Sequence, residues 1–154
     1  MMLNKLNKED SDPEFFHFTP VQIRFNDIDI MGHVNNANFQ DYFDLARLNY
    51  FSKVFGEPLS WDSISLILAG ICIDYHHTVH LDDEILIASK TTLIGNKSLQ
   101  MIQEVHKVPE RRIMASSRAV LVAFDAAVNC SVKVPAKWKE QITAFEKVVG
   151  FKYS

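Results

Sequence analysis

The chain has 154 residues, of which 47% are hydrophobic and 23% charged, and its formal net charge is -3. This length suits a single domain, and the composition is ordinary for a globular protein. A mildly acidic balance gives no basic field for nucleic acid or an anionic membrane, so we expect a small-molecule ligand or a second copy of the chain as partner.

Features that would send the chain to another compartment are missing from the sequence. Cys72 and Cys130 are the only cysteines and form no CxxC pair, and the N-terminus has no signal-peptide pattern. No apolar run approaches the roughly 20 residues of a membrane span. We therefore expect a cytoplasmic protein with reduced thiols and no membrane partner.

The N-terminal residues 1–18 are predicted to form an extension, partly disordered because residues 1–12 carry few apolar groups and dense mixed charge. Phe15, Phe16 and Phe18 are expected to be packed, since three aromatic rings in water would be costly. Residues 19–154 then form one domain.

The hydrophobic period changes within residues 21–51. Residues 21–25 alternate apolar and polar side chains, which predicts a half-buried strand. From Phe39 to Phe51 the apolar residues recur at helical spacing over much of the circumference. A helix of this kind is expected to be buried by a sheet that wraps around it.

The connection at residues 26–36 is unusually polar, with two carboxylates, a glycine, an imidazole and several amides. Gly32 suits a positive φ at a sharp turn, and Asn35 or Asn36 is a good N-cap for the helix. The first-turn amides of that helix would face the loop and favour an anion or a developing oxyanion.

Strand-like runs follow at residues 63–74, 84–94, 99–108 and 113–125, joined by short turns that make neighbouring strands antiparallel. Ala69-Gly70 suggests a bulge, and a closing helix is predicted at residues 138–149, after Pro135. The fold class is therefore α+β: one curled antiparallel sheet wrapped around a long central helix, with a C-terminal helix. Strands that are apolar on both faces indicate a homodimer or homotetramer.

Three motifs carry a family resemblance: Asp27-Ile28-Asp29, the run from Met31 to Asn36, and the run from Tyr42 to Arg47. Over about residues 19–145 the chain resembles hot-dog-fold acyl-CoA thioesterases of the 4-hydroxybenzoyl-CoA thioesterase type. The resemblance implies hydrolysis of a thioester to a carboxylic acid and CoA, without cofactor or metal. The substrate would be an acyl-CoA or an acyl carrier protein thioester.

The same resemblance implies catalytic roles for Asp29, His33 and Asn36. Asp29 would act as general base on water or as nucleophile, although an acidic residue before a helix also caps turns. His33 could hold or give a proton near neutrality, and the backbone N–H of Asn36 would polarise the thioester carbonyl. Met31 stands where similar plant acyl carrier protein thioesterases have asparagine.

Substrate-binding roles are expected for Asn35, Tyr42, Arg47, Tyr75, Lys97 and Ser98. Asn35 could instead serve only as a cap, and Gly95-Asn96-Lys97-Ser98 could be a plain hairpin turn rather than a contact for CoA phosphates. The proline usual after the aromatic Tyr75 is replaced by histidine, which indicates an altered substrate end of the pocket.

The run from Asp74 to His80 also invites a metal interpretation, because alternation would place Asp74, His76 and His80 on one side of a strand. We predict no metal site there, since the sequence has no further histidine pair that would complete one.

Two other functions stay open. One is a hot-dog hydroxyacyl dehydratase, although the helix offers only Asp41 and Asp44 where such enzymes have a glutamate. The other is a non-catalytic acyl-CoA-binding module.

Overall fold

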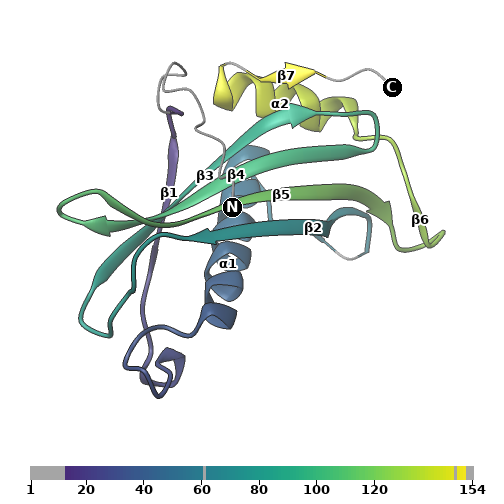
Figure 1. Ribbon diagram of the computed structural model, residues 1–154. Coiled ribbons are helices and arrows are strands. Elements are labelled where there is room, and N and C mark those ends of the chain that lie inside the picture. Colours follow the sequence, from purple (N-terminus) through teal and green to yellow (C-terminus); the bar gives the residue numbers. More distant parts are fainter. Residues whose placement is uncertain (1–12, 61, 148, 152–154) are drawn as a thin grey trace, which may run out of the picture.

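A computed structural model describes residues 13–60, 62–147 and 149–151 of the chain. One sheet curls around helix α1 (Asn36–Phe55), and helix α2 (Ala136–Glu146) follows near the C-terminal end (Figure 1). The long strands are β1 (His17–Val21), β2 (Ile64–Tyr75), β3 (Glu84–Ile94), β4 (Ser98–Val108) and β5 (Arg112–Asp125). They are antiparallel in the order β1-β3-β4-β5-β2, with β6 (Cys130–Ser131) beside β5 and β7 (Gly150–Phe151) beside β3.

This is the predicted α+β arrangement, and the four predicted strands after α1 agree with β2 to β5 within one residue at each end. The predicted bulge in β2 is present as a register shift between Leu68 and Gly70. Helix α2 ends three residues earlier than predicted, because Lys147 takes φ 65° at its C-cap. No helix in the described part of the chain is long and apolar enough to cross a membrane.

The first strand was predicted wrongly at residues 21–25. Strand β1 covers His17–Val21, and Phe25–Asp27 form a short 3-10 helix, η1, in which Phe25 is 80% exposed. The cause is local: the Asp27 carboxylate accepts the backbone N–H of Arg24 at 2.9 Å and so competes with strand pairing. Because β1 begins at His17, the sheet starts before the predicted domain boundary, while residues 1–12 lie outside the described residues. Phe15 and Phe16 are partly buried, but Phe18 is 47% exposed.

Helix α1 begins at a residue that the sequence suggested. Asn35 is its N-cap, and Gly56 ends it with φ 74°, a left-handed conformation that favours glycine. One face of the helix is buried in the curl of the sheet, and Phe43, Ala46 and Tyr50 on that face have no exposed surface. Burial, rather than helix propensity, therefore holds this element in place.

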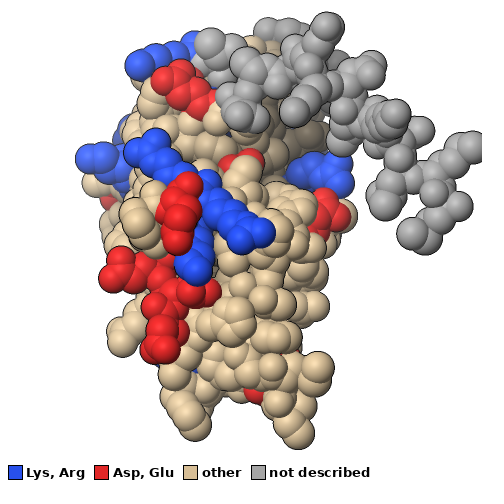
Figure 2. All heavy atoms as spheres, turned by 60° about the vertical axis from the view of Figure 1, so that its left-hand side comes forward, with Lys and Arg blue, Asp and Glu red and all other residues tan. Residues whose placement is uncertain are grey.

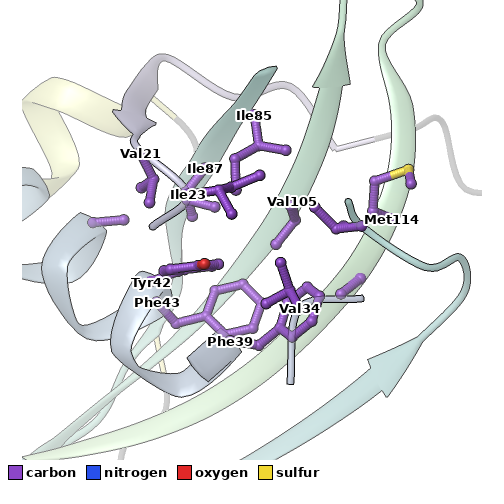
Figure 3. Packing of buried hydrophobic residues seen from close by; sticks show 13 residues of the cluster. Val21, Ile23, Val34, Phe39, Tyr42, Phe43, Ile85, Ile87, Val105 and Met114 are labelled. Atoms are coloured by element: carbon purple, nitrogen blue, oxygen red, sulfur yellow. The ribbon is translucent and has the colours of Figure 1, made fainter. Parts of the chain in front are cut away.

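Two clusters of buried apolar side chains fill the space between α1 and the sheet. The first lies at the start of α1 and includes Val34, Phe39, Phe43, Ile87 and Val105 (Figure 3). The second lies at the end of α1, where Phe55 stacks on Trp138 of α2 with ring centroids 4.8 Å apart. Each end of the helix thus has its own packing environment.

A buried polar cluster, here called the Glu146 network, joins α2 to α1 and β3. The Glu146 carboxylate accepts the hydroxyl of Tyr50 at 2.6 Å and the N–H of Thr91 at 3.2 Å, and it pairs with Lys90 Nζ at 3.2 Å. Burial and this carboxylate raise the pKa of Tyr50 far above its ordinary value. The His17 ring lies edge-on to Tyr50 at 5.6 Å, and burial lowers the pKa of His17.

Candidate active site

The connection between η1 and α1 folds into a compact polar loop, residues 26–35. Gly32 takes φ 84° and its N–H donates to Asp29 O at 3.0 Å, while Asp29 N donates to His33 O at 2.9 Å. Val34 N donates to Val79 O at 2.8 Å and ties the loop to the segment that follows β2. Main-chain bonds therefore fix much of the loop.

The two carboxylates of the loop have opposite surroundings. Asp27 is buried and accepts the hydroxyl of Tyr42 at 2.6 Å and both the N–H and the guanidinium of Arg24, at 2.9 and 3.1 Å. Burial alone would raise the pKa of Asp27, but these hydrogen bonds outweigh it and hold the pKa below its usual value. Asp27 is thus fully engaged in holding the loop.

Asp29 is half-buried, and its carboxylate makes a local bond in which Oδ1 accepts the N–H of Met31 at 2.9 Å. This leaves Oδ2 as the freer oxygen. Asp29 lines a pocket of about 200 Å³, called here the Asp29 pocket. The other lining residues are His33, Val34, Asn36, Phe39, Tyr75, His76, His77, Thr78 and Val79.

The N-terminus of α1 meets the same pocket. Asn35 Oδ1 accepts the N–H of Ala37 at 3.0 Å, and Asn35 O accepts the N–H of Asn38 at 2.9 Å. Asn35 thus acts as a cap, and the N–H of Asn36 is left as the donor of the first turn. Tyr75 closes over this end of the helix, its hydroxyl donating to Asn36 O at 3.1 Å. A partial positive charge of about half a unit is expected at such a terminus.

The structure therefore brings four of the predicted site residues together: Asp29, His33, Asn36 and Tyr75. The His33 ring also meets His80 edge-on, with centroids 5.5 Å apart. A carboxylate, an imidazole and a helix N-terminus around one small pocket can activate water, move a proton and stabilise an oxyanion.

Other predicted substrate-binding residues lie elsewhere in the chain. Tyr42 is bonded to Asp27, and Arg47 is buried with its Nη1 donating to Asp44 at 2.6 Å. Lys97 and Ser98 form the predicted turn between β3 and β4, where Gly95 N donates to Ser98 O at 2.7 Å. Ser98 pairs with Val122 of β5, whereas Tyr75 pairs with Ala115, so the turn is about 23 Å along the sheet from the pocket.

The run after Asp74 does not continue as a strand, because β2 ends at Tyr75. His76 is within 2.9 Å of Ser116 Oγ, and His77 is bonded to Arg112, so neighbouring histidines have different partners. Within residues 13–60, 62–147 and 149–151, no group of three His, Cys, Asp or Glu side chains is arranged to hold a metal ion.

The pocket is also lined by residues that the sequence interpretation did not assign to a site, namely Val34, Phe39, His77, Thr78 and Val79. Phe39 looked like a core position, and it is one: a single ring serves both the core and the pocket. The acidic residues that a dehydratase would need on α1 are outside the lining, since Asp41 is exposed and Asp44 is bonded to Arg47.

Comparison with known proteins identifies the family of the chain. Residues 23–144 match the family model described as the thioesterase-like superfamily. The chain is 22% identical over 132 residues to the long-chain acyl-CoA thioesterase FadM of Escherichia coli, covering 84% of this chain and 98% of that protein. It is 31% identical over 87 residues to YsmA of Bacillus subtilis, covering 56% of this chain and 58% of that protein.

Among solved structures, a thioesterase from Thermus thermophilus in complex with coenzyme A and Zn superposes with a TM-score of 0.75 at 29% identity. The match covers 87% of this chain and 96% of that one. The curled antiparallel sheet around a central helix is thus shared with a structure whose ligand is coenzyme A.

Proposed function

The chain belongs to the thioesterase-like superfamily, and on this premise we propose that it is an acyl-CoA thioesterase. It would hydrolyse a thioester to a carboxylic acid and free CoA. The acyl-CoA thioesterase FadM among its relatives, and the coenzyme A bound to the similar Thermus thermophilus structure, support this class of substrate.

The observation that carries the proposal is the Asp29 pocket. It holds one carboxylate that the fold leaves available, beside His33 and the start of α1. Its neighbour Asp27 is fully engaged with Tyr42 and Arg24, so the sequence pair Asp27-Asp29 divides into a structural and a reactive member. This matches the roles that the hot-dog resemblance implies.

In the proposed reaction, Asp29 takes a proton from water that attacks the thioester carbonyl. Alternatively, Asp29 attacks the carbonyl itself and forms an acyl anhydride, which water hydrolyses after the thiolate has left. The N–H of Asn36 donates to the oxygen on which negative charge develops, and a donor of this kind contributes about 2.7–4 kcal/mol to catalysis. The C–S bond then breaks, and His33 orients the group or supplies the proton that the departing thiolate takes up.

The identity of the acyl group and of its thiol carrier is also part of the proposal. The 4-hydroxybenzoyl-CoA thioesterase type remains the expected subgroup, and an acyl carrier protein thioester is the alternative substrate. A single domain over residues 19–154 remains the expected organisation, in the cytoplasm.

We further propose that the protein works as a homodimer or homotetramer. Strand β2 is at the edge of the sheet and bears no proline or lysine that would protect an edge. If β2 paired antiparallel with a second copy, the 95–98 turn of that copy would come to the pocket end of the sheet. Lys97 and Ser98 could then contact CoA, although they are distant within one chain. The lower end of the face drawn in Figure 2 carries few Lys or Arg side chains.

Thiol release from a panel of aliphatic and aromatic acyl-CoAs tests the proposal directly. Turnover of at least one substrate that is lost in Asp29→Asn, with folding intact, is the expected result. Tight binding of acyl-CoA without any thiol release would instead make the chain a binding module. Hydration of enoyl-CoA with saturated thioesters left intact would favour the dehydratase.

A further inference from the structure

The second wall of the Asp29 pocket is a short segment that main-chain bonds hold in place. The N–H groups of His76 and His77 both donate to Met114 O, at 2.8 and 3.0 Å, and Val79 O accepts the N–H of Val34. His76, His77 and Thr78 therefore line the pocket from a backbone that is held in place. Nothing in the proposed hydrolysis uses them.

The tautomer of His77 follows from its partner. Arg112, the first residue of β5, places Nη2 3.1 Å from His77 Nδ1. A guanidinium has donors only, so Arg112 donates and Nδ1 must accept. The ring proton of a neutral His77 is therefore on Nε2. The other charged or titratable groups that line the pocket are Asp29 and His33 from the loop, with Tyr75 and His76 on the segment of His77.

We infer that His77 is a further substrate-binding residue, which donates its Nε2–H to a substrate oxygen other than the reacting carbonyl, and that Arg112 positions it. The inference rests on the proposed function, since it concerns a thioester bound in the Asp29 pocket. The acceptor could belong to the acyl group, as a hydroxyl or oxo oxygen, or to an amide carbonyl of the pantetheine arm. Both are neutral oxygen acceptors.

Substrate pairs distinguish these two sources. We would compare kcat/KM for 3-hydroxybutanoyl-CoA and butanoyl-CoA in the wild type, His77→Phe and His77→Gln. Loss of one hydrogen bond is expected to lower kcat/KM about tenfold in His77→Phe. A loss confined to the hydroxylated substrate places the acceptor on the acyl group, and an equal loss for both places it on the pantetheine arm. His77→Gln, which keeps an N–H donor, should recover most of the loss, and no loss in His77→Phe overturns the inference.

Arg112 is tested through the tautomer itself. Long-range 1H–15N spectra should show the His77 proton on Nε2 in the wild type and in Arg112→Lys, and both tautomers in Arg112→Met. Arg118→Met, an exposed arginine on the same strand, is the control.

These readouts separate the inference from the proposed function. A wild type that hydrolyses no acyl-CoA of the whole panel refutes the acyl-CoA hydrolase, and the spectra still decide the role of Arg112. A wild-type His77 that carries its proton on Nδ1, or spectra unchanged in Arg112→Met, overturns the positioning role whatever the activity.

Discussion

The carboxylates near the two ends of α1 differ in how fully they are hydrogen-bonded within the protein. At the C-terminal end, the Glu146 network is buried, and its carboxylate is bonded to Tyr50, Thr91 and Lys90. At the N-terminal end, Asp29 keeps one oxygen free beside a pocket. Carboxylates whose bonds are completed inside the fold stabilise it, and those left incomplete are available to a ligand. This contrast predicts that substitutions at one end affect activity and at the other end affect stability.

The sharpest test is Asp29→Asn, which we expect to lower kcat by up to about 10⁴-fold because the general base or nucleophile is lost. Asp125→Asn is a matched control. Asp125 Oδ1 accepts the N–H of Ala127 at 2.9 Å, the same local bond that Asp29 makes with Met31, but in a turn outside the pocket lining. Steady-state thiol release and thermal unfolding would be measured for both. Equal activity losses in the two variants would mean that the local bond, not the free oxygen, matters.

At the other end, Glu146→Ala should destabilise the protein by about 3–5 kcal/mol, because it removes the carboxylate that pairs with the largely buried Lys90 and accepts the buried Tyr50 hydroxyl. Urea unfolding measures this loss, with the exposed Glu140→Ala on the same helix as control. The activity of the folded fraction should stay near that of the wild type. If Glu146→Ala lowered activity without lowering stability, the two ends of α1 would not differ in the way proposed.

A third test concerns the backbone of Asn36. Asn36→Pro removes the N–H at the first helical position, where proline is tolerated, and Asn35 before it already has the extended ψ of 136° that proline requires. We expect kcat to fall by about 10²–10³-fold, whereas Asn36→Ala keeps the N–H and should change it little. Similar kinetics for the two variants would remove the oxyanion role from this amide.

Asp27 lies at the N-terminal end of α1, but its carboxylate is hydrogen-bonded within the protein like that of Glu146. Its substitution should therefore affect stability. Asp27→Asn should cost about 1–3 kcal/mol of stability through the weakened bonds to Tyr42 and Arg24. Since the folded pKa lies below the unfolded value of about 3.9, the wild type loses this contribution as pH falls through the folded pKa. Unfolding at pH 3 and pH 7 should therefore differ less in the variant than in the wild type.

The smallest effect is expected at His17. Its folded pKa is lowered, so the unfolded chain binds the proton more tightly and stability falls as pH drops below about 6.5. We expect a change under about 1 kcal/mol between pH 7 and 5, absent in His17→Gln, by urea unfolding at both values. An acid loss that persists in the variant would assign it to another group.

Periodicity and turn residues were sufficient to predict most of the fold. The strands β2 to β5 and both caps of α1 follow from local patterns, because alternation, Asn35 and Gly56 act over a few residues. The position of the first strand was predicted wrongly, because the Asp27 carboxylate accepts the backbone N–H of Arg24 and residues 25–27 form a 3-10 helix. A side chain that competes with a neighbouring strand for a backbone N–H group is hard to detect from the hydrophobic pattern alone.

The candidate site was predictable only where its residues are contiguous. Asp29, His33 and Asn36 share one loop and were found together, whereas Arg112 meets His77 across 35 positions and has no local signature. Tyr42 has a pattern that suits a pocket as well as a core, and only its 2.6 Å bond to Asp27 decides between them. The Glu146 network is equally remote, since Tyr50 and Glu146 are 96 positions apart.

The bond from Val34 N to Val79 O joins the two walls of the pocket through main-chain atoms alone. This hydrogen bond does not depend on which side chains the two walls carry. His76, His77 and Thr78 can therefore be exchanged during evolution while Asp29 and the helix N-terminus keep their places. One architecture could in this way acquire new acyl preferences by substitution at three neighbouring positions, without rebuilding its chemistry.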